Sequence, residues 1–244
     1  LEKHVLTRDK RLKLFFDYSN NKESGVMFCD AVGYKNIIYL GVKNKSEIIS
    51  IDMTNSKIEK IQLTDFECKI NTLSNKDGSL FVTLQDRTDI IKLDLCTFKD
   101  ENIATNICWD KKGAPFSKVI ALNEKKLIIL PAQSEKIIVF DNGIISELDY
   151  PEGFYWIDDF KRNWSKMGPH IIMDDKVIIY PSVGNMELIY DIHSRKLTGR
   201  EYCLPRNWIL TSCVINQGVG ISKVIYESND NNLKEYLLCV EKNK

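Results

Sequence analysis

Short apolar runs that end in an aspartate recur along this chain. The four runs are Ile48–Asp52, Ile90–Asp94, Ile137–Asp141 and Leu188–Asp191, and their aspartates are 42, 47 and 50 residues apart. Each run is rich in β-branched and aromatic residues and is only four or five residues long, as β-strands are. A period of this length predicts a repeat protein in which every repeat forms one small sheet.

The third repeat shows how many strands each unit contains. Apolar segments at 116–122, 126–130, 136–140 and 144–148 are separated by short runs of turn residues such as Asn142-Gly143. Such spacing predicts a four-stranded antiparallel sheet in each repeat. Aligned on this unit, the repeats cover residues 25–63, 68–107, 116–148, 169–203 and, more weakly, 208–241.

The fifth repeat contains only three predicted strands, and an extra strand is available near the start of the chain. Residues 11–17 read RLKLFFD and belong to no other repeat. A ring of sheets has to close or leave sheet edges exposed. We therefore expect a single all-β domain over residues 1–244, a five-bladed β-propeller closed by strand 11–17 pairing with the last blade. Because the chain opens on Leu1, a fragment of a six- or seven-bladed ring is the alternative.

The repeat architecture resembles the broad propeller class that includes the kelch and WD-repeat families. The resemblance covers essentially the whole chain, but the kelch double glycine is absent and the Trp-Asp pair at Trp109-Asp110 falls between repeats. The resemblance therefore implies a fold, and no family's functional residues can be transferred to this sequence.

Composition narrows the expected partners. Lys+Arg and Asp+Glu both number 34, so the formal net charge is zero, and neither nucleic acid nor a membrane is expected as a partner. The seven cysteines are scattered singly without a C-x-x-C pair, which favours reduced thiols in a cytoplasmic protein. Three histidines without a Cys/His cluster predict no metal site, and no motif predicts a cofactor; His170 alone lies near a candidate site.

The recurring aspartates themselves have a structural interpretation. Asp52, Asp94, Asp141 and Asp191 each stand where a third strand ends and a turn begins. An aspartate in that position accepts hydrogen bonds from the backbone N–H groups of the turn. We therefore expect turn caps rather than catalytic groups.

The candidate binding site is on the face formed by the connections between blades. In a propeller these connections share one face with the turns between second and third strands, here 131–134 and 181–185. The connection at 149–168 is the longest and is rich in aromatic residues, and long connections are commonly functional. The predicted ligand-binding residues are Trp109, Tyr155, Trp156, Asp158, Asp159, Arg162, Trp164, Arg206 and Trp208.

Two structural alternatives apply to these aromatic residues. Tryptophans between blades can pack as wedges, as buried aromatic side chains commonly do. Residues 156–166 can also form a short helix, because Trp156, Phe160 and Trp164 share one face at helical spacing. Either arrangement would bury rings that the binding hypothesis needs in contact with a ligand.

We expect a non-catalytic propeller that binds a carbohydrate, a peptide or a protein partner, because flat rings among amides and carboxylates suit such ligands. The alternative is a glycosidase-like enzyme with paired carboxylates in the central cleft. Its candidate acids are Asp30, Glu67, Asp158, Asp159 and Glu187. A third possibility is an assembly platform within a larger protein.

Overall fold

The protein is built from small antiparallel sheets. A computed structural model describes residues 2–6, 12–17, 27–103, 105, 107, 109, 113–132, 136–156, 167–181, 184–201, 208–216, 220–229 and 232–240. Among these residues, all regular elements are strands, and none forms a helix that is long and apolar enough to cross a membrane. By backbone contacts the chain divides into two compact units, Leu1–Ala104 and Thr105–Lys244, which are described separately below.

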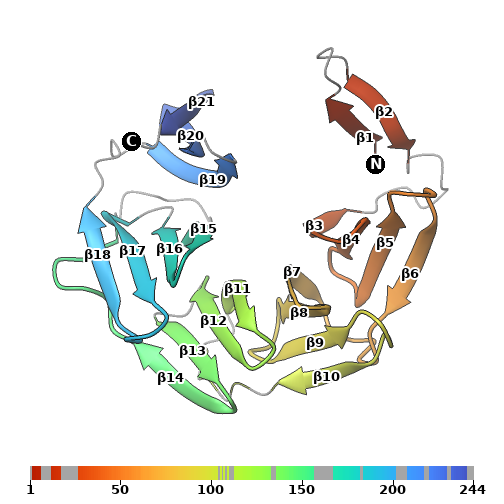
Figure 1. The fold of residues 1–244 in the computed structure, drawn as a ribbon, viewed down its shortest axis with the longest axis horizontal. Coiled ribbons are helices and arrows are strands. Elements are labelled where there is room, and N and C mark those ends of the chain that lie inside the picture. Colours follow the sequence, from red (N-terminus) through yellow and green to blue (C-terminus); the bar gives the residue numbers. More distant parts are fainter. Residues whose placement is uncertain are drawn as a thin grey trace. The chain divides into compact units, whose positions relative to one another are not determined.

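The first unit contains two four-stranded sheets and an N-terminal hairpin (Figure 1). In the first sheet the strand order is β3 (Phe28–Tyr34), β4 (Ile37–Val42), β5 (Glu47–Asp52) and β6 (Ile58–Gln62). In the second sheet it is β7 (Ile70–Lys76), β8 (Ser79–Leu84), β9 (Ile90–Asp94) and β10 (Asp100–Ile103). The hairpin pairs β1 (Glu2–Leu6) with β2 (Leu12–Asp17).

The second unit contains two further four-stranded sheets and a three-stranded one. The third sheet consists of β11 (Phe116–Asn123), β12 (Lys126–Pro131), β13 (Ile137–Asp141) and β14 (Ile144–Leu148). The fourth consists of β15 (Met167–Met173), β16 (Lys176–Pro181), β17 (Met186–Asp191) and β18 (Leu197–Glu201). The last sheet contains β19 (Trp208–Asn216), β20 (Gly220–Asn229) and β21 (Asn232–Val240).

Most strands lie where the hydrophobic pattern predicts them. In the third repeat, the predicted strand 144–148 agrees residue for residue with β14, and the other three predicted strands differ from β11, β12 and β13 by one residue. One pairing differs from the expectation: β2 pairs with β1, a strand that the sequence pattern did not predict, in a two-stranded sheet. Pairing of residues 11–17 with the last sheet therefore remains a prediction.

Each inner strand carries a register shift near its start, a feature that no sequence pattern predicted. The residue that follows the shift is polar in all five inner strands, namely Asp30, Thr72, Lys118, His170 and Ser212. A bulge of this kind bends the strand and changes the direction of the side chain beside it. In the four-stranded sheets, the bulges therefore set where the polar side chains lie along the inner strand.

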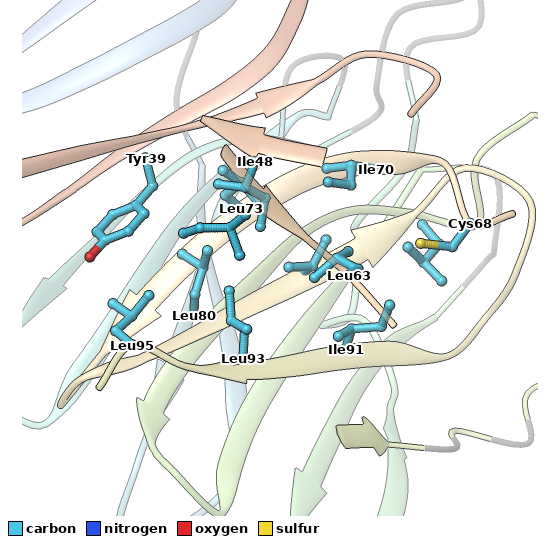
Figure 2. Packing of buried hydrophobic residues seen from close by; sticks show 13 residues of the cluster. Tyr39, Ile48, Leu63, Cys68, Ile70, Leu73, Leu80, Ile91, Leu93 and Leu95 are labelled. Carbon is cyan, nitrogen blue, oxygen red and sulfur yellow. The ribbon is translucent and has the colours of Figure 1, made fainter. Parts of the chain in front are cut away.

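An apolar core between the first and second sheets stabilises the first unit (Figure 2). Tyr39 and Ile48 come from the first sheet, and Leu73, Val82 and Leu93 come from the second. Gly41 lies on the same face as Tyr39, and a Cβ there would be 3.0 Å from Ile70 Cγ2. Small size at this position lets the two sheets approach, and burial of the surrounding side chains is the main source of stability.

A corresponding core joins the third and fourth sheets in the second unit. Ile128, Leu130, Ile137 and Val139 project from the third sheet toward Val177, Ile179, Leu188 and Tyr190 of the fourth. These residues alternate along each strand, so one face of the third sheet packs against one face of the fourth. The β19 strand of the last sheet packs beside β15.

Three of the four recurring aspartates cap turns as expected. Asp52 accepts a hydrogen bond from the Thr54 N–H at 2.7 Å. Asp94 accepts from the N–H groups of Cys96 and Thr97, and Asp191 accepts from those of His193 and Ser194. These bonds lower the pKa of all three carboxyls, since each bond favours the charged form.

Asp141 departs from this pattern. Its strand is followed by a two-residue hairpin turn with positive φ at Asn142 and Gly143, in which the Asn142 N–H donates to the Lys125 carbonyl at 2.9 Å. The carboxylate instead forms an ion pair with Arg195 of the fourth sheet, 2.7 Å from its Nη2. The turn-cap prediction is therefore wrong for Asp141, and the reason is the shorter turn.

Candidate functional site

The connection that follows β14 begins with a packed cluster of three aromatic rings. Tyr150 and Phe154 stack with their centroids 4.5 Å apart, and Trp156 meets both rings edge-on. All three are partly buried against the core between the third and fourth sheets. We call residues 149–156 the aromatic loop; these three rings anchor it to the sheet pair.

Asn185 fastens the other side of the aromatic loop. Its Oδ1 accepts a hydrogen bond from the Tyr155 N–H at 2.9 Å, and its Nδ2 donates to the Gly153 carbonyl at 3.0 Å. The Asn185 N–H donates in turn to the Tyr155 carbonyl, and Trp156 forms a β-bridge with Gly184. One residue in the β16–β17 turn thus satisfies three backbone groups of the loop, two of them through its side chain.

Gly184 allows this close contact. A Cβ at that position would lie 3.0 Å from Phe154 Cε2 and 2.8 Å from the Pro181 side chain. Any larger residue would therefore push the aromatic loop away from the turn. The expectation that turn 181–185 lies beside the long connection is confirmed at Gly184 and Asn185, although the sequence did not single out Asn185 as the residue that fixes the loop.

Tyr155 is presented to solvent by this fixed backbone. Its exposure is 61%, whereas Phe154 and Trp156 on either side are partly buried. At the start of the loop, Asp149 accepts a 2.6 Å hydrogen bond from Lys136 Nζ, and this bond lowers the pKa of the Asp149 carboxyl. The loop therefore holds one exposed aromatic ring on a backbone that does not have to order on binding.

The other predicted site residues are only partly placed by the structure. Trp109 is partly buried, and its indole nitrogen is covered and makes no hydrogen bond to any described residue. Trp208 begins β19. Five further predicted residues lie outside the described residues, namely Asp158, Asp159, Arg162, Trp164 and Arg206. The predicted helix 156–166 also lies outside them, except for Trp156. Their grouping with Tyr155 remains a prediction.

Two of the three described carboxylates proposed for the enzyme alternative, Asp30 and Glu187, are engaged in structural contacts. Asp30 accepts 2.8 Å hydrogen bonds from the N–H groups of Ala31 and, across the sheet interface, Leu73. Glu187 is 2% exposed and pairs with Arg200 on the adjacent strand. Glu67 is exposed in the connection between the first two sheets. Asp158 and Asp159 lie outside the described residues.

His170 is the histidine that the sequence placed near the site. Pairing with Ile179 turns it toward the third sheet, and pairing with Leu130 turns Lys118 toward the fourth, so the two side chains face each other. Burial, with a smaller effect of the Lys118 charge, lowers the pKa of His170 to about 4. The imidazole is therefore neutral at pH 7. No group of three His, Cys, Asp or Glu side chains suited to a metal is found among the described residues.

Comparison with known proteins identifies the fold. No family model matches the sequence, and no curated protein matches it. Virginiamycin B lyase from Staphylococcus aureus, solved with quinupristin, is similar in structure with a TM-score of 0.68 at 13% identity, over 96% of this chain and 76% of that one. A streptogramin B lyase structure gives a TM-score of 0.67 at 13% identity, over 98% and 77% of the two chains.

A third similar structure has a different role. The extracellular domain of a one component system from B. thetaiotaomicron gives a TM-score of 0.61 at 13% identity and covers 95% of this chain but 30% of that one. At these identities the similarity shows the fold alone. Together with the four-stranded antiparallel sheets, it establishes that the chain has a β-propeller fold.

Proposed function

We propose that the protein is a non-catalytic binding propeller whose ligand is a carbohydrate, a peptide or a segment of a protein partner. The ligand would contact the face that carries the aromatic loop. Of the predicted site residues, Trp109, Tyr155, Trp156, Asp158, Asp159, Arg162, Trp164, Arg206 and Trp208 are proposed to line this face.

One observation carries the proposal: an exposed tyrosine on a backbone that is already ordered. Tyr155 is 61% exposed, yet Asn185 bonds to both its N–H and its carbonyl, and to the carbonyl of Gly153. Tyrosine offers a flat apolar ring and a polar hydroxyl at little conformational cost, which is why it is frequent in binding surfaces. A ring fixed in this way favours a ligand with both apolar faces and hydrogen-bonding edges.

The described contacts favour binding over hydrolysis. A glycosidase needs two carboxylates about 5–10 Å apart across a water-accessible cleft. Asp30 is bonded to two backbone N–H groups, and Glu187 is buried against Arg200. Two of the structurally similar proteins are lyases, so propeller folds can also carry catalysis, and activity assays belong with the binding experiment.

The test is a titration of intrinsic tryptophan fluorescence with a panel of glycans and peptides. Trp156 packs beside Phe154, next to Tyr155 in sequence, so binding at the aromatic loop should change its emission. We expect Tyr155→Ala to weaken binding at least tenfold while leaving Tm within a degree or two, because an exposed side chain contributes little to stability.

Ile144→Ala is the matched control. Ile144 is 72% exposed and follows the β13–β14 turn, so its truncation removes a comparable exposed apolar side chain away from the aromatic loop. Equal loss of binding in both variants, or unchanged binding in Tyr155→Ala, would overturn the proposal. Turnover of a bound glycan that disappears in Glu187→Gln would instead support the enzyme alternative.

We also propose that five blades form the ring and that residues 11–17 complete the last one. The last sheet has three strands where the four preceding sheets have four. The face of the first sheet that points away from the second is apolar and buried, through Leu40, Val42, Ile49 and Ile51, as expected for a blade with neighbours on both sides.

Hydrogen exchange tests the closure. A proline removes a backbone donor, so Leu14→Pro should speed exchange at residues 232–240 if strand 11–17 pairs with β21. Exchange that accelerates only at Glu2–Leu6, the observed partner of β2, would contradict the five-blade closure and leave the binding proposal untouched.

A further inference from the structure

The turn between β13 and β14 contains the one Asn-Gly pair of the chain. Asn142 is the only asparagine in the sequence that is followed by glycine, and asparagine is a thermolabile residue. The turn has two residues, since Asp141 pairs directly with Ile144. Both turn residues have positive φ, 52° at Asn142 and 84° at Gly143, as a type I′ hairpin requires. The hairpin therefore favours a pair of residues that can react with each other.

An asparagine amide can be attacked by the backbone nitrogen of the residue that follows it. That nitrogen loses its proton to solvent and bonds to the asparagine Cγ, the Cγ–Nδ2 bond breaks, and the amide nitrogen leaves as ammonia. Water then opens the cyclic imide at either of its carbonyls, which gives aspartate or isoaspartate. The overall reaction is the hydrolysis of an amide and consumes only water. A side chain on the following residue hinders the attack, and glycine has none.

The structure leaves this attack open at Asn142. Asn142 and Gly143 are both exposed to solvent. The Gly143 N–H makes no hydrogen bond to any described residue. A Cβ built on Gly143 would meet no atom beyond its chain neighbours within 4 Å. The nucleophilic nitrogen therefore has neither a competing partner nor a crowded approach among the described residues.

Other exposed asparagines in turns lack this combination. Asn44 is followed by lysine, Asn55 by serine and Asn123 by glutamate, so in each case a Cβ hinders the attacking nitrogen. The side chains of Asn55 and Asn123 are also held through their carbonyl oxygens, each of which accepts the N–H two residues further on at 2.8 Å. These residues provide internal references for the reactivity of Asn142.

The amide of Asn142 also contributes to a contact between the third and fourth sheets. Its Nδ2 donates to Asp141 Oδ1 at 2.7 Å, and Arg195 of the fourth sheet lies 2.7 Å from Oδ2 of the same carboxylate. Loss of ammonia removes this donor and places a second carboxylate beside Asp141. Isoaspartate in addition lengthens the backbone of a two-residue turn by one methylene group. Either product should weaken the start of the β13–β14 pairing.

We propose that Asn142 is a deamidation site of the folded protein, and that the reaction gives the β13–β14 turn an additional negative charge. Because ammonia is lost to solvent, the change is irreversible and accumulates with the age of the chain. The turn precedes β14 and the aromatic loop follows the same strand, so the reaction takes place at the other end of β14 and does not depend on the proposed function.

The experiment is incubation of the folded full chain at mildly alkaline pH in water enriched in oxygen-18, followed by peptide mapping with mass spectrometry. We expect product at Asn142 to form several-fold faster than at Asn44, Asn55 or Asn123, and to retain one heavy oxygen from water. A methyltransferase specific for isoaspartate distinguishes the two products. Asn142→Gln should not react, because its longer side chain would have to form a larger and less favoured ring.

Asn142→Asp reproduces the aspartyl product and gives a second readout. It should lower Tm by roughly 2–4 °C, the shift expected when a chain of this length loses about one side-chain hydrogen bond. Hydrogen exchange at residues 144–148 should accelerate. Asn55→Asp is the matched control: Asn55 serves its turn as an acceptor, a role that aspartate keeps, so Tm should change less.

The chain unfolded in urea is the reference for the reaction itself. Deamidation of Asn142 in urea but not in the folded chain would show that the turn protects the amide, and would overturn the proposal. A folded-chain rate at Asn142 no higher than that at Asn55 would overturn it as well. An Asn142→Asp variant with the Tm and exchange of the wild type would contradict the structural role assigned to the amide.

Discussion

The interface between the first and second sheets and the interface between the third and fourth sheets both have an apolar core, but they differ in the contacts of their polar side chains. Asp30 pairs with Gly41, and Lys118 pairs with Leu130, so the two residues occupy corresponding positions on the inner strands of the first and third sheets. The Asp30 carboxylate accepts a hydrogen bond from the Leu73 N–H of the next sheet. Lys118 instead faces His170, the counterpart of Leu73.

The connection between the first two sheets and the aromatic loop also differ in the contacts that hold their backbones. In the first unit, Phe66 is 74% exposed on a short connection. The Ser46 hydroxyl donates a hydrogen bond to the Phe66 carbonyl, and the neighbouring Asp65 forms an ion pair with Arg87. In the second unit, Asn185 holds a longer loop with three packed rings and exposed Tyr155. The two connections therefore both carry an exposed aromatic ring, and they differ in how the backbone that carries the ring is held.

Truncation of the cores gives the largest expected effect and tests whether the two interfaces are equivalent. Leu73→Ala in the first unit and Ile179→Ala in the second each remove a side chain that is fully buried. Each should lower the free energy of unfolding by roughly 2–5 kcal/mol, from lost burial and the resulting cavity. Urea denaturation measures the loss, and hydrogen exchange shows where it acts.

If both variants lose protection across all sheets, the two units unfold as one. Loss confined to residues 27–103 in Leu73→Ala, and to residues after 113 in Ile179→Ala, would show separate cooperative units. A surface substitution such as Lys57→Gln is the control for nonspecific effects.

Acid should weaken the second interface more than the first because of His170. Its pKa falls from 6.5 to about 4 on folding, so between these values the unfolded chain binds more protons than the folded one. This contribution is complete above pH 6.5 and is lost as the pH falls toward 4, to a total of roughly 3 kcal/mol.

The check is urea denaturation of the wild type and His170→Gln from pH 7 to pH 4. The difference between the two curves isolates His170 from the carboxyl groups, which titrate in both proteins. A constant difference across this range would contradict a neutral, buried imidazole. Lys118→Met should reduce the pH dependence only slightly, since the charge is the smaller cause.

The smallest expected loss of stability comes from substitutions that free the aromatic loop or the connection that carries Phe66. Asn185→Ala removes the side-chain bonds to Gly153 and Tyr155 and should cost about 1–2 kcal/mol, chiefly by loosening the aromatic loop. Exchange at the Tyr155 amide should accelerate. Ser46→Ala, which removes the bond to the Phe66 carbonyl, is the matched change in the first unit and should leave the Tyr155 amide unaffected. Faster exchange at Tyr155 in both variants would indicate general destabilisation instead.

The sequence by itself determined the strands and the repeat. The strand Ile144–Leu148 could be predicted to the residue, because alternation and turn chemistry are local. The same locality explains the aspartate caps at residues 52, 94 and 191. It also explains the error at Asp141, whose strand is followed by a turn of only two residues.

Only the tertiary structure decided which distant polar groups meet. Asn185 reaches the aromatic loop, Arg195 reaches Asp141 and the Tyr190 hydroxyl is buried because two sheets pack through particular faces and inner-strand bulges redirect the backbone. These contacts depend on the packing of segments tens of residues apart, which hydrophobic periodicity does not encode. The sequence could therefore indicate the connection that carries Tyr155, while the contacts that hold it were visible only in three dimensions.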